Sequence, residues 1–174
     1  MYKIFIIILF VLCSSISATA QTSFKWNDST VSFKGNKVSE SIIIDNAKEP
    51  SMQSDFYYVF DKSTKTHIVH LVKTSIKDGV KSIYLIYKYL IPASSIVASD
   101  LIVETAENSS YKTGGFLYVS LRCKDDKEDI VTYEKSSHYY DFDNENKINE
   151  FSFEAGLTDK AILEKLIQQI KNNH

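Results

Sequence analysis

Cysteine, arginine, glycine and proline are all scarce in this chain of 174 residues, and each scarcity narrows what the protein can be. Five glycines and two prolines are too few for glycine-rich loops that cradle phosphates. The sequence also has no Gly-x-Ser-x-Gly elbow and no His-Glu-x-x-His pair. No cofactor is therefore expected, and no motif identifies an enzyme. Arg122 is the only arginine, a bias that AT-rich bacterial coding produces.

Residues 1–20 predict a secretory signal peptide. Lys3 supplies the initial positive charge, residues 4–12 form an uninterrupted apolar run, and the small residues Ala18 and Ala20 stand where a signal peptidase reads. Cleavage is expected directly after Ala20. A membrane anchor is the alternative, but this run is less than half of the about 20 residues that cross a bilayer.

Loss of the signal peptide removes Cys13 and leaves Cys123 alone in a single expected domain, residues 21–174. One cysteine cannot form an internal disulfide, on which small extracellular animal domains usually depend. This favours a bacterial protein that is secreted or periplasmic and is held together by its core. In a lipoprotein alternative Cys13 would carry the lipid, but Leu12 stands before it, where lipoprotein signals have a small residue.

The charge balance is slightly acidic, with 20 basic and 22 acidic residues. Loss of Lys3 with the signal peptide leaves 19 basic against 22 acidic residues, a net charge near −3. Nucleic-acid binding is not expected, because no basic surplus is present to neutralise a phosphate backbone. No transmembrane segment is expected after cleavage.

The stretch from Ile83 to Ile91 is apolar on both faces, which is typical of a central strand. A second β-rich run covers residues 66–74, and Asp78 and Gly79 lie between the two runs as a two-residue hairpin turn. That turn predicts a register, which pairs Ile68 with Tyr89, His70 with Tyr87, Val72 with Leu85 and Leu71 with Ile86.

Other alternating segments predict a β-rich domain closed by one helix. Strands are expected at residues 38–44, 55–60, 101–105, 116–123, 130–134, 138–142 and 148–153, with a first hairpin around Asn27 to Ser29, a loop at 47–54 and a turn at 143–147. An amphipathic helix is expected over residues 158–172, with Thr158 as its N-cap. Its apolar stripe is Ile162, Leu163, Leu166, Ile167 and Ile170.

The expected fold is mainly β, α+β by content. It is an antiparallel bent β-sandwich or partly open barrel of about seven to nine strands, with the C-terminal helix packed on it. This order resembles the pleckstrin-homology-like superfold, a bent sandwich or barrel plugged by a C-terminal helix. The alternative is a lipocalin-like barrel, which the early Trp26 fits. Phe24, however, stands where lipocalins have glycine, and no strand follows the helix.

Histidines are the first candidates for chemistry. His67 and His70 are three residues apart on a predicted strand, so they face opposite ways and cannot easily share a metal. One is expected to be half-buried against Tyr87 and the other exposed. His138 stands near Asp141 and Asp143 and could act with them as acid and base. Strand alternation separates His138 from both carboxylates, so a hydrolase site needs a bulge there.

Two further candidates are weaker. Residues 141–145 alternate acidic oxygens as a calcium loop does, but Asn146 replaces the glycine and Ser152 the glutamate that an EF-hand requires. Cys123 is flanked by Arg122 and Lys124, yet on a strand both point away from it, so a core residue is expected. No metal site is predicted.

Tyrosine is abundant, with eleven residues, and ten phenylalanines accompany it. The leading hypothesis is a non-enzymatic binding domain that meets a protein or small-molecule ligand on an aromatic sheet face. The contact residues predicted for it are Tyr84, Tyr87, Tyr89, Tyr139 and Tyr140. Two alternatives remain: a carrier with a small apolar ligand inside a barrel, and a hydrolase centred on His138.

Overall fold

A computed structural model gives the fold of most of the chain. It describes residues 21–26, 29–43, 51–97, 102–106, 115–136 and 139–173. These residues form a mainly β protein with one α-helix, α1 (Lys160–Asn172), at the C-terminal end of the described chain. The expected fold class is confirmed at this level, with eleven strands among the described residues instead of seven to nine.

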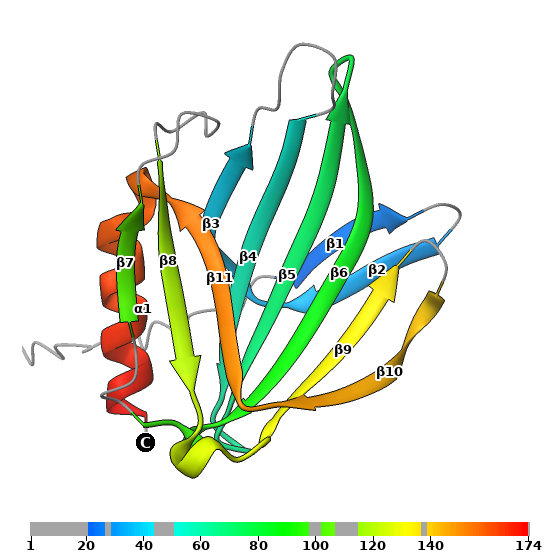
Figure 1. Ribbon diagram of the computed structural model, residues 1–174. Coiled ribbons are helices and arrows are strands. Elements are labelled where there is room, and N and C mark those ends of the chain that lie inside the picture. Colours follow the sequence, from blue (N-terminus) through cyan, green and yellow to red (C-terminus); the bar gives the residue numbers. More distant parts are fainter. Residues whose placement is uncertain are drawn as a thin grey trace, which may run out of the picture.

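Nine of the strands form two antiparallel sheets, and the other two form a separate hairpin (Figure 1). The six-stranded sheet has the order β10 (Tyr139–Ile148), β9 (Ile130–Ser136), β6 (Val80–Pro92), β5 (Thr66–Lys77), β4 (Ser51–Asp61), β3 (Asn36–Ile43). The three-stranded sheet has the order β11 (Glu150–Gly156), β8 (Phe116–Arg122), β7 (Ile102–Ala106). The hairpin is β1 (Gln21–Trp26) and β2 (Ser29–Lys34). The two sheets do not close into a barrel.

The β5–β6 hairpin confirms the expected turn and corrects the expected register. Asp78 and Gly79 have φ angles of 52° and 77°, as a two-residue turn of this kind requires. The predicted pairs are wrong by one residue, because Thr74 pairs with Ile83 whereas Lys73 pairs with Leu85. Tyr84 is therefore an extra residue in β6, a β-bulge that the alternation pattern does not reveal. Beyond it the observed pairs are His70 with Lys88, Leu71 with Tyr87 and Val72 with Ile86.

Two other expectations about loops are wrong. The loop expected at residues 47–54 is strand from Ser51 onward, and the turn expected at residues 143–147 lies inside β10. In the first case the polar composition suggested an exposed loop, but the polar residues Gln53 and Asp55 are buried in β4. The Gln53 amide donates to both oxygens of Asp55, at 2.8 and 3.0 Å. Polar side chains that satisfy one another can lie inside a sheet.

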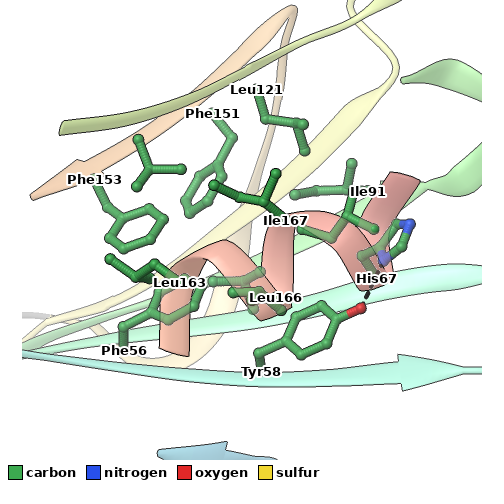
Figure 2. Close-up of a pocket in the computed structure, with 13 residues that line it drawn as sticks. Phe56, Tyr58, His67, Ile91, Leu121, Phe151, Phe153, Leu163, Leu166 and Ile167 are labelled. Carbon is green, nitrogen blue, oxygen red and sulfur yellow. Dashed lines mark hydrogen bonds between the residues drawn. The ribbon is translucent and has the colours of Figure 1, made fainter. Parts of the chain in front are cut away.

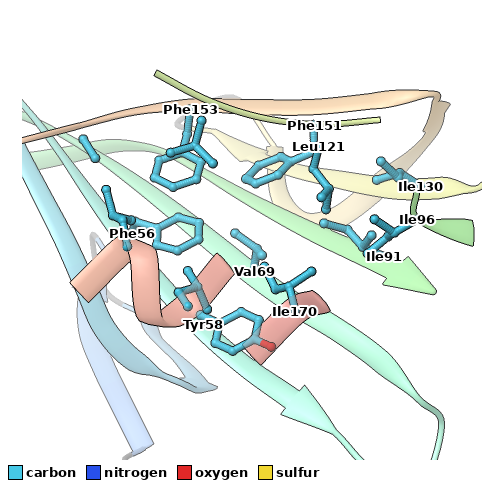
Figure 3. Close-up of a cluster of buried hydrophobic side chains, with 14 of the residues drawn as sticks. Phe56, Tyr58, Val69, Ile91, Ile96, Leu121, Ile130, Phe151, Phe153 and Ile170 are labelled. Carbon is cyan, nitrogen blue, oxygen red and sulfur yellow. The ribbon is translucent and has the colours of Figure 1, made fainter. Parts of the chain in front are cut away.

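The six-stranded sheet has two different faces. Its inner face meets the three-stranded sheet and α1 across the main core, whereas its outer face is crossed by β2. The main core contains Phe56, Tyr58, Val69, Ile91, Leu117, Leu121, Ile130, Phe151 and Phe153, with Phe56 and Phe153 stacked at 4.1 Å (Figure 3). A smaller outer cluster holds Phe33 of β2 against Tyr57, Val72 and Ile86. β5 and β6 are thus covered on both faces, which the sequence predicts for the Ile83–Ile91 stretch of β6.

The C-terminal helix lies between the two sheets. Leu163, Leu166 and Ile170 are buried in the main core, and Figure 2 shows Leu163 and Leu166 among Phe56, Tyr58 and Phe153. The expected start is wrong, because a 3-10 turn, η4 (Leu157–Asp159), precedes the helix and Thr158 does not cap it. Ile162 is 50% exposed and so does not belong to the buried stripe.

Two contacts tie the start of the helix to β3. The Asp159 carboxylate accepts a hydrogen bond at 3.0 Å from the backbone N–H of Glu40. A Cβ at Gly156 would lie 2.6 Å from the Glu40 carbonyl oxygen, so only glycine allows this approach. At the other end of β11, Asn149 alone separates it from β10, so the chain passes from one sheet to the other within one residue.

Candidate functional site

The space enclosed between the two sheets and α1 is nearly filled. Its cavity measures about 20 Å³, and Figure 2 shows the apolar side chains around it. A volume of this size holds about one water molecule. A ligand inside the fold would therefore need α1 to move away.

His67 belongs to this interior. It is 0% exposed, and its Nδ1 lies 2.9 Å from the Tyr58 hydroxyl (Figure 2). Burial raises the pKa of Tyr58 to about 12, so the phenol keeps its proton at neutral pH. Phe60 packs on the imidazole at 4.8 Å between ring centroids. The pair is enclosed by apolar side chains and has no path to a substrate in this conformation.

The outer face of the six-stranded sheet carries a larger, open groove of about 720 Å³ between β2 and strands β4 to β6. We call it the outer groove. Its lining residues are Ser32, Phe33 and Lys34 of β2, Val59, Phe60 and Asp61 of β4, Lys62 and Ser63 of the following turn, Ile68 and His70 of β5, and Lys88 of β6. Most of these residues are polar or charged, and Phe33, Val59, Phe60 and Ile68 add a smaller apolar surface, so a ligand here would meet both kinds of group.

His70 is the most deeply buried polar group of the outer groove. It is 4% exposed, and its ring stacks on Phe33 with 4.0 Å between centroids and 9° between planes. Within the described part of the chain, His70 Nδ1 has no hydrogen-bond partner. Burial, together with the positive charge of Lys88, lowers the pKa of His70 to about 4. The imidazole is therefore neutral at pH 7 and offers one donor and one acceptor.

A cluster of polar side chains on β3, β4 and β6 forms ion pairs and hydrogen bonds within itself. Lys37 forms ion pairs with Asp55 at 2.8 Å and with Glu40, and Lys81 donates to the Gln53 side chain at 2.9 Å. Burial opposes the charge on Lys37, but the hydrogen bonds that its ammonium donates to Asp55 and Glu40 raise its pKa above the ordinary value. The hydrogen bond from Lys37 lowers the pKa of Glu40. These mutual contacts stabilise β3 on β4 and leave little capacity for a ligand.

The two histidines on β5 lie on opposite faces, as expected. The expected exposure is wrong, because both are buried: His67 lies in the main core and His70 lies under Phe33, not against Tyr87. β2 covers a face that the sequence of β5 alone gives no reason to cover. His138 lies outside the described residues, as do the side chains of Asp141 and Asp143, so the hydrolase hypothesis stays a prediction.

The predicted tyrosine contact surface stays a prediction, because the structure describes the side chains of only three of its five members, Tyr84, Tyr87 and Tyr89. Tyr87 and Tyr89 lie 6.0 Å apart between ring centroids, but Tyr89 packs on Phe151 at 4.5 Å and so joins the main core. Tyr84 is the bulged residue, and burial raises its pKa. The side chains of Tyr139 and Tyr140 lie outside the described part of the chain. Tyr87 is half-buried, and the Lys73 ammonium lies 5.9 Å from its ring centroid.

Cys123 is a core residue, as expected. It is 1% exposed, and burial raises the pKa of its thiol, which opposes nucleophilic chemistry. Arg122 pairs with Glu150 at 3.0 Å and Lys124 donates to the Ser94 carbonyl at 3.0 Å, so both point elsewhere. Among the described side chains, no group of three His, Cys, Asp or Glu is arranged to hold a metal ion.

Comparison with known proteins identified no relative of this chain. No protein-family model, curated protein or solved structure matches the chain. None of the helices in the described part is both long enough and apolar enough to span a membrane. The outer groove, with its buried histidine, is thus the candidate site that the fold itself offers.

Proposed function

We propose that the protein is an exported, non-enzymatic binding domain that holds a small ligand in the outer groove. The observation that carries this proposal is the groove itself, about 720 Å³ between β2 and the sheet, against about 20 Å³ inside the fold. Ligands usually occupy concave, largely preformed sites of several hundred Å³. The Ser63 hydroxyl of the groove donates to Asp61 at 2.6 Å within the β4–β5 turn, and His70 Nδ1 has no described partner that it could activate as a base, which favours binding over catalysis.

The finer fold assignment is also part of the proposal. We infer a pleckstrin-homology-like architecture, because the C-terminal helix packs at the opening between two antiparallel sheets. The lipocalin-like alternative has less support, because the sheets are not closed and the interior is filled.

Ligand binding in the outer groove can be tested with a fluorescent probe and with a substitution that occupies the groove. N-phenyl-1-naphthylamine, a neutral fluorescent probe, is expected to bind the protein with a single saturable site, measured by fluorescence titration. Ile68→Trp places an indole on the floor of the groove and is expected to weaken binding at least about tenfold, since the probe and the indole compete for the same volume.

The matched control is Ile162→Trp, which puts the same side chain on the exposed face of α1. It is expected to leave the titration unchanged. Equal affinity in the wild type and Ile68→Trp, or the absence of saturable binding, would contradict a ligand site in the outer groove.

Export is tested by intact mass. The protein isolated from its own host's envelope or medium is expected to lack residues 1–20, since Ala18 and Ala20 form the cleavage signal. Ala18→Tyr is expected to block cleavage, because a signal peptidase requires a small residue at that position. A full-length mass in the wild type would contradict cleavage, and a lipid-modified chain beginning at Cys13 would identify a lipoprotein.

A further inference from the structure

The outer groove is positively charged, although the chain as a whole has a net charge of −2. Lys34, Lys62 and Lys88 line it, against Asp61 as the only carboxylate. Among the described residues, none of these three lysines forms an ion pair. Three ammonium groups around one concave surface attract an anion, because a cleft concentrates the field of its charges.

The Asp61 carboxylate accepts hydrogen bonds from residues of the β4–β5 turn. Its Oδ1 accepts from the Ser63 N–H at 2.8 Å, the Ser63 hydroxyl at 2.6 Å and the Thr64 N–H at 3.4 Å. These hydrogen bonds lower the pKa of Asp61 and hold the carboxylate over the β4–β5 turn. Asp61 therefore stabilises the turn and stays ionised, and its single charge offsets one of the three lysines, so the groove keeps a net positive charge.

Lys88 lies next to the buried histidine of the groove. It is half-buried on β6, its Cα is the cross-strand partner of His70, and its ammonium lies 5.4 Å from the ring centroid of Tyr133. A partly desolvated ammonium interacts more strongly with an anion than an exposed one does. The imidazole of His70 lies beside Lys88, and its Nδ1 is buried and has no protein partner among the described residues.

The apolar part of the groove lies beside these groups. Phe33 covers His70 from above, and Val59 and Ile68 contribute aliphatic surface from β4 and β5. We propose that the outer groove selects an organic anion, with its charged group beside Lys88 and its apolar part against Phe33 and Ile68. This inference rests on the proposed function, because it names the ligand class of the same site.

Three probes with one ring system and different charge test the selectivity. We would titrate the protein with 2-naphthoate, 2-naphthamide and 2-naphthylmethylammonium at pH 7 and low salt, and follow backbone amide shifts by NMR. 2-Naphthoate is expected to bind about tenfold tighter than 2-naphthamide, with the cation weakest. Lys88→Gln is expected to remove the preference for 2-naphthoate while the affinity for 2-naphthamide stays the same.

Lys147→Gln, an exposed lysine of β10 outside the groove, is the matched control and should keep the preference. Lys34→Gln, on β2, should reduce the preference by a smaller factor, and it serves if Lys88→Gln does not fold. Equal binding of all three probes in the groove would overturn the anion inference and leave the proposed function standing. Failure of every probe to shift the groove amides would overturn both.

Discussion

Leu163→Ala is expected to lower the free energy of unfolding by about 3 to 4 kcal/mol. Leu163 is 1% exposed and lies between the two sheets, so truncation removes contacts with both at once (Figure 2). The surrounding rings belong to sheet residues that cannot move into the gap without disturbing their strands. The measurement is urea unfolding followed by circular dichroism, with the midpoint and slope fitted together.

Ile162→Ala is the matched control, since it is the adjacent residue of the same helix and 50% exposed. It is expected to change the free energy of unfolding by no more than about 0.5 kcal/mol. Equal losses in the two variants would show that α1 docks through a different face. A small loss at Leu163 would show that the helix contributes little to the core.

His70 is expected to make the fold sensitive to acid. Its pKa is about 4 in the folded protein, against an ordinary value of 6.5. A histidine with a lowered pKa stabilises the fold fully above the ordinary pKa, and this contribution is lost as the pH falls from 6.5 through 4, because the unfolded chain takes up the proton first. The wild type is expected to lose about 3 kcal/mol from this group alone between pH 7 and pH 4.

The comparison variant is His70→Gln, which cannot titrate. Its free energy of unfolding should fall less than that of the wild type over the same pH range, and the difference isolates His70 from the carboxylates. NMR titration of the His70 ring protons measures the pKa directly. An NMR pKa near 6.5, or parallel pH profiles for the two proteins, would show that Phe33 and Lys88 do not hold the ring in the neutral state.

Local patterns predict most of the secondary structure. The Asp78–Gly79 turn, the β5 and β6 strands and the C-terminal helix follow from alternation, turn chemistry and helical periodicity, which involve neighbouring residues only. The bulge at Tyr84 does not, because an inserted residue leaves each half of the strand with its own correct alternation. Ile162 shows a similar limit of local patterns. Helical periodicity places it in the apolar stripe of α1, but the sheets cover only part of that stripe and leave Ile162 exposed.

The candidate site depends on contacts between distant segments. The outer groove exists because β2 crosses strands β4 to β6, and nothing in residues 29–34 specifies that crossing. Phe33 and His70 each look like ordinary strand residues until they are stacked. The usable signal is the apolar content of residues 83–91 on both faces, which requires something to cover the outer face of β6 as well. The abundance of tyrosine indicates a binding surface less directly, because aromatic residues also pack against cores, as Tyr89 does.

The link between Glu40 and Asp159 spans 119 positions of the sequence. The main core also needs β11 and α1, so the strands before them cannot bury their inner face until these last elements are synthesised. Contacts that join distant parts of a chain form slowly, because loop closure costs entropy before the contact is gained. This topology therefore delays compaction until the segment that forms α1 has been synthesised, and a chain exported as proposed above would still be unfolded at that stage.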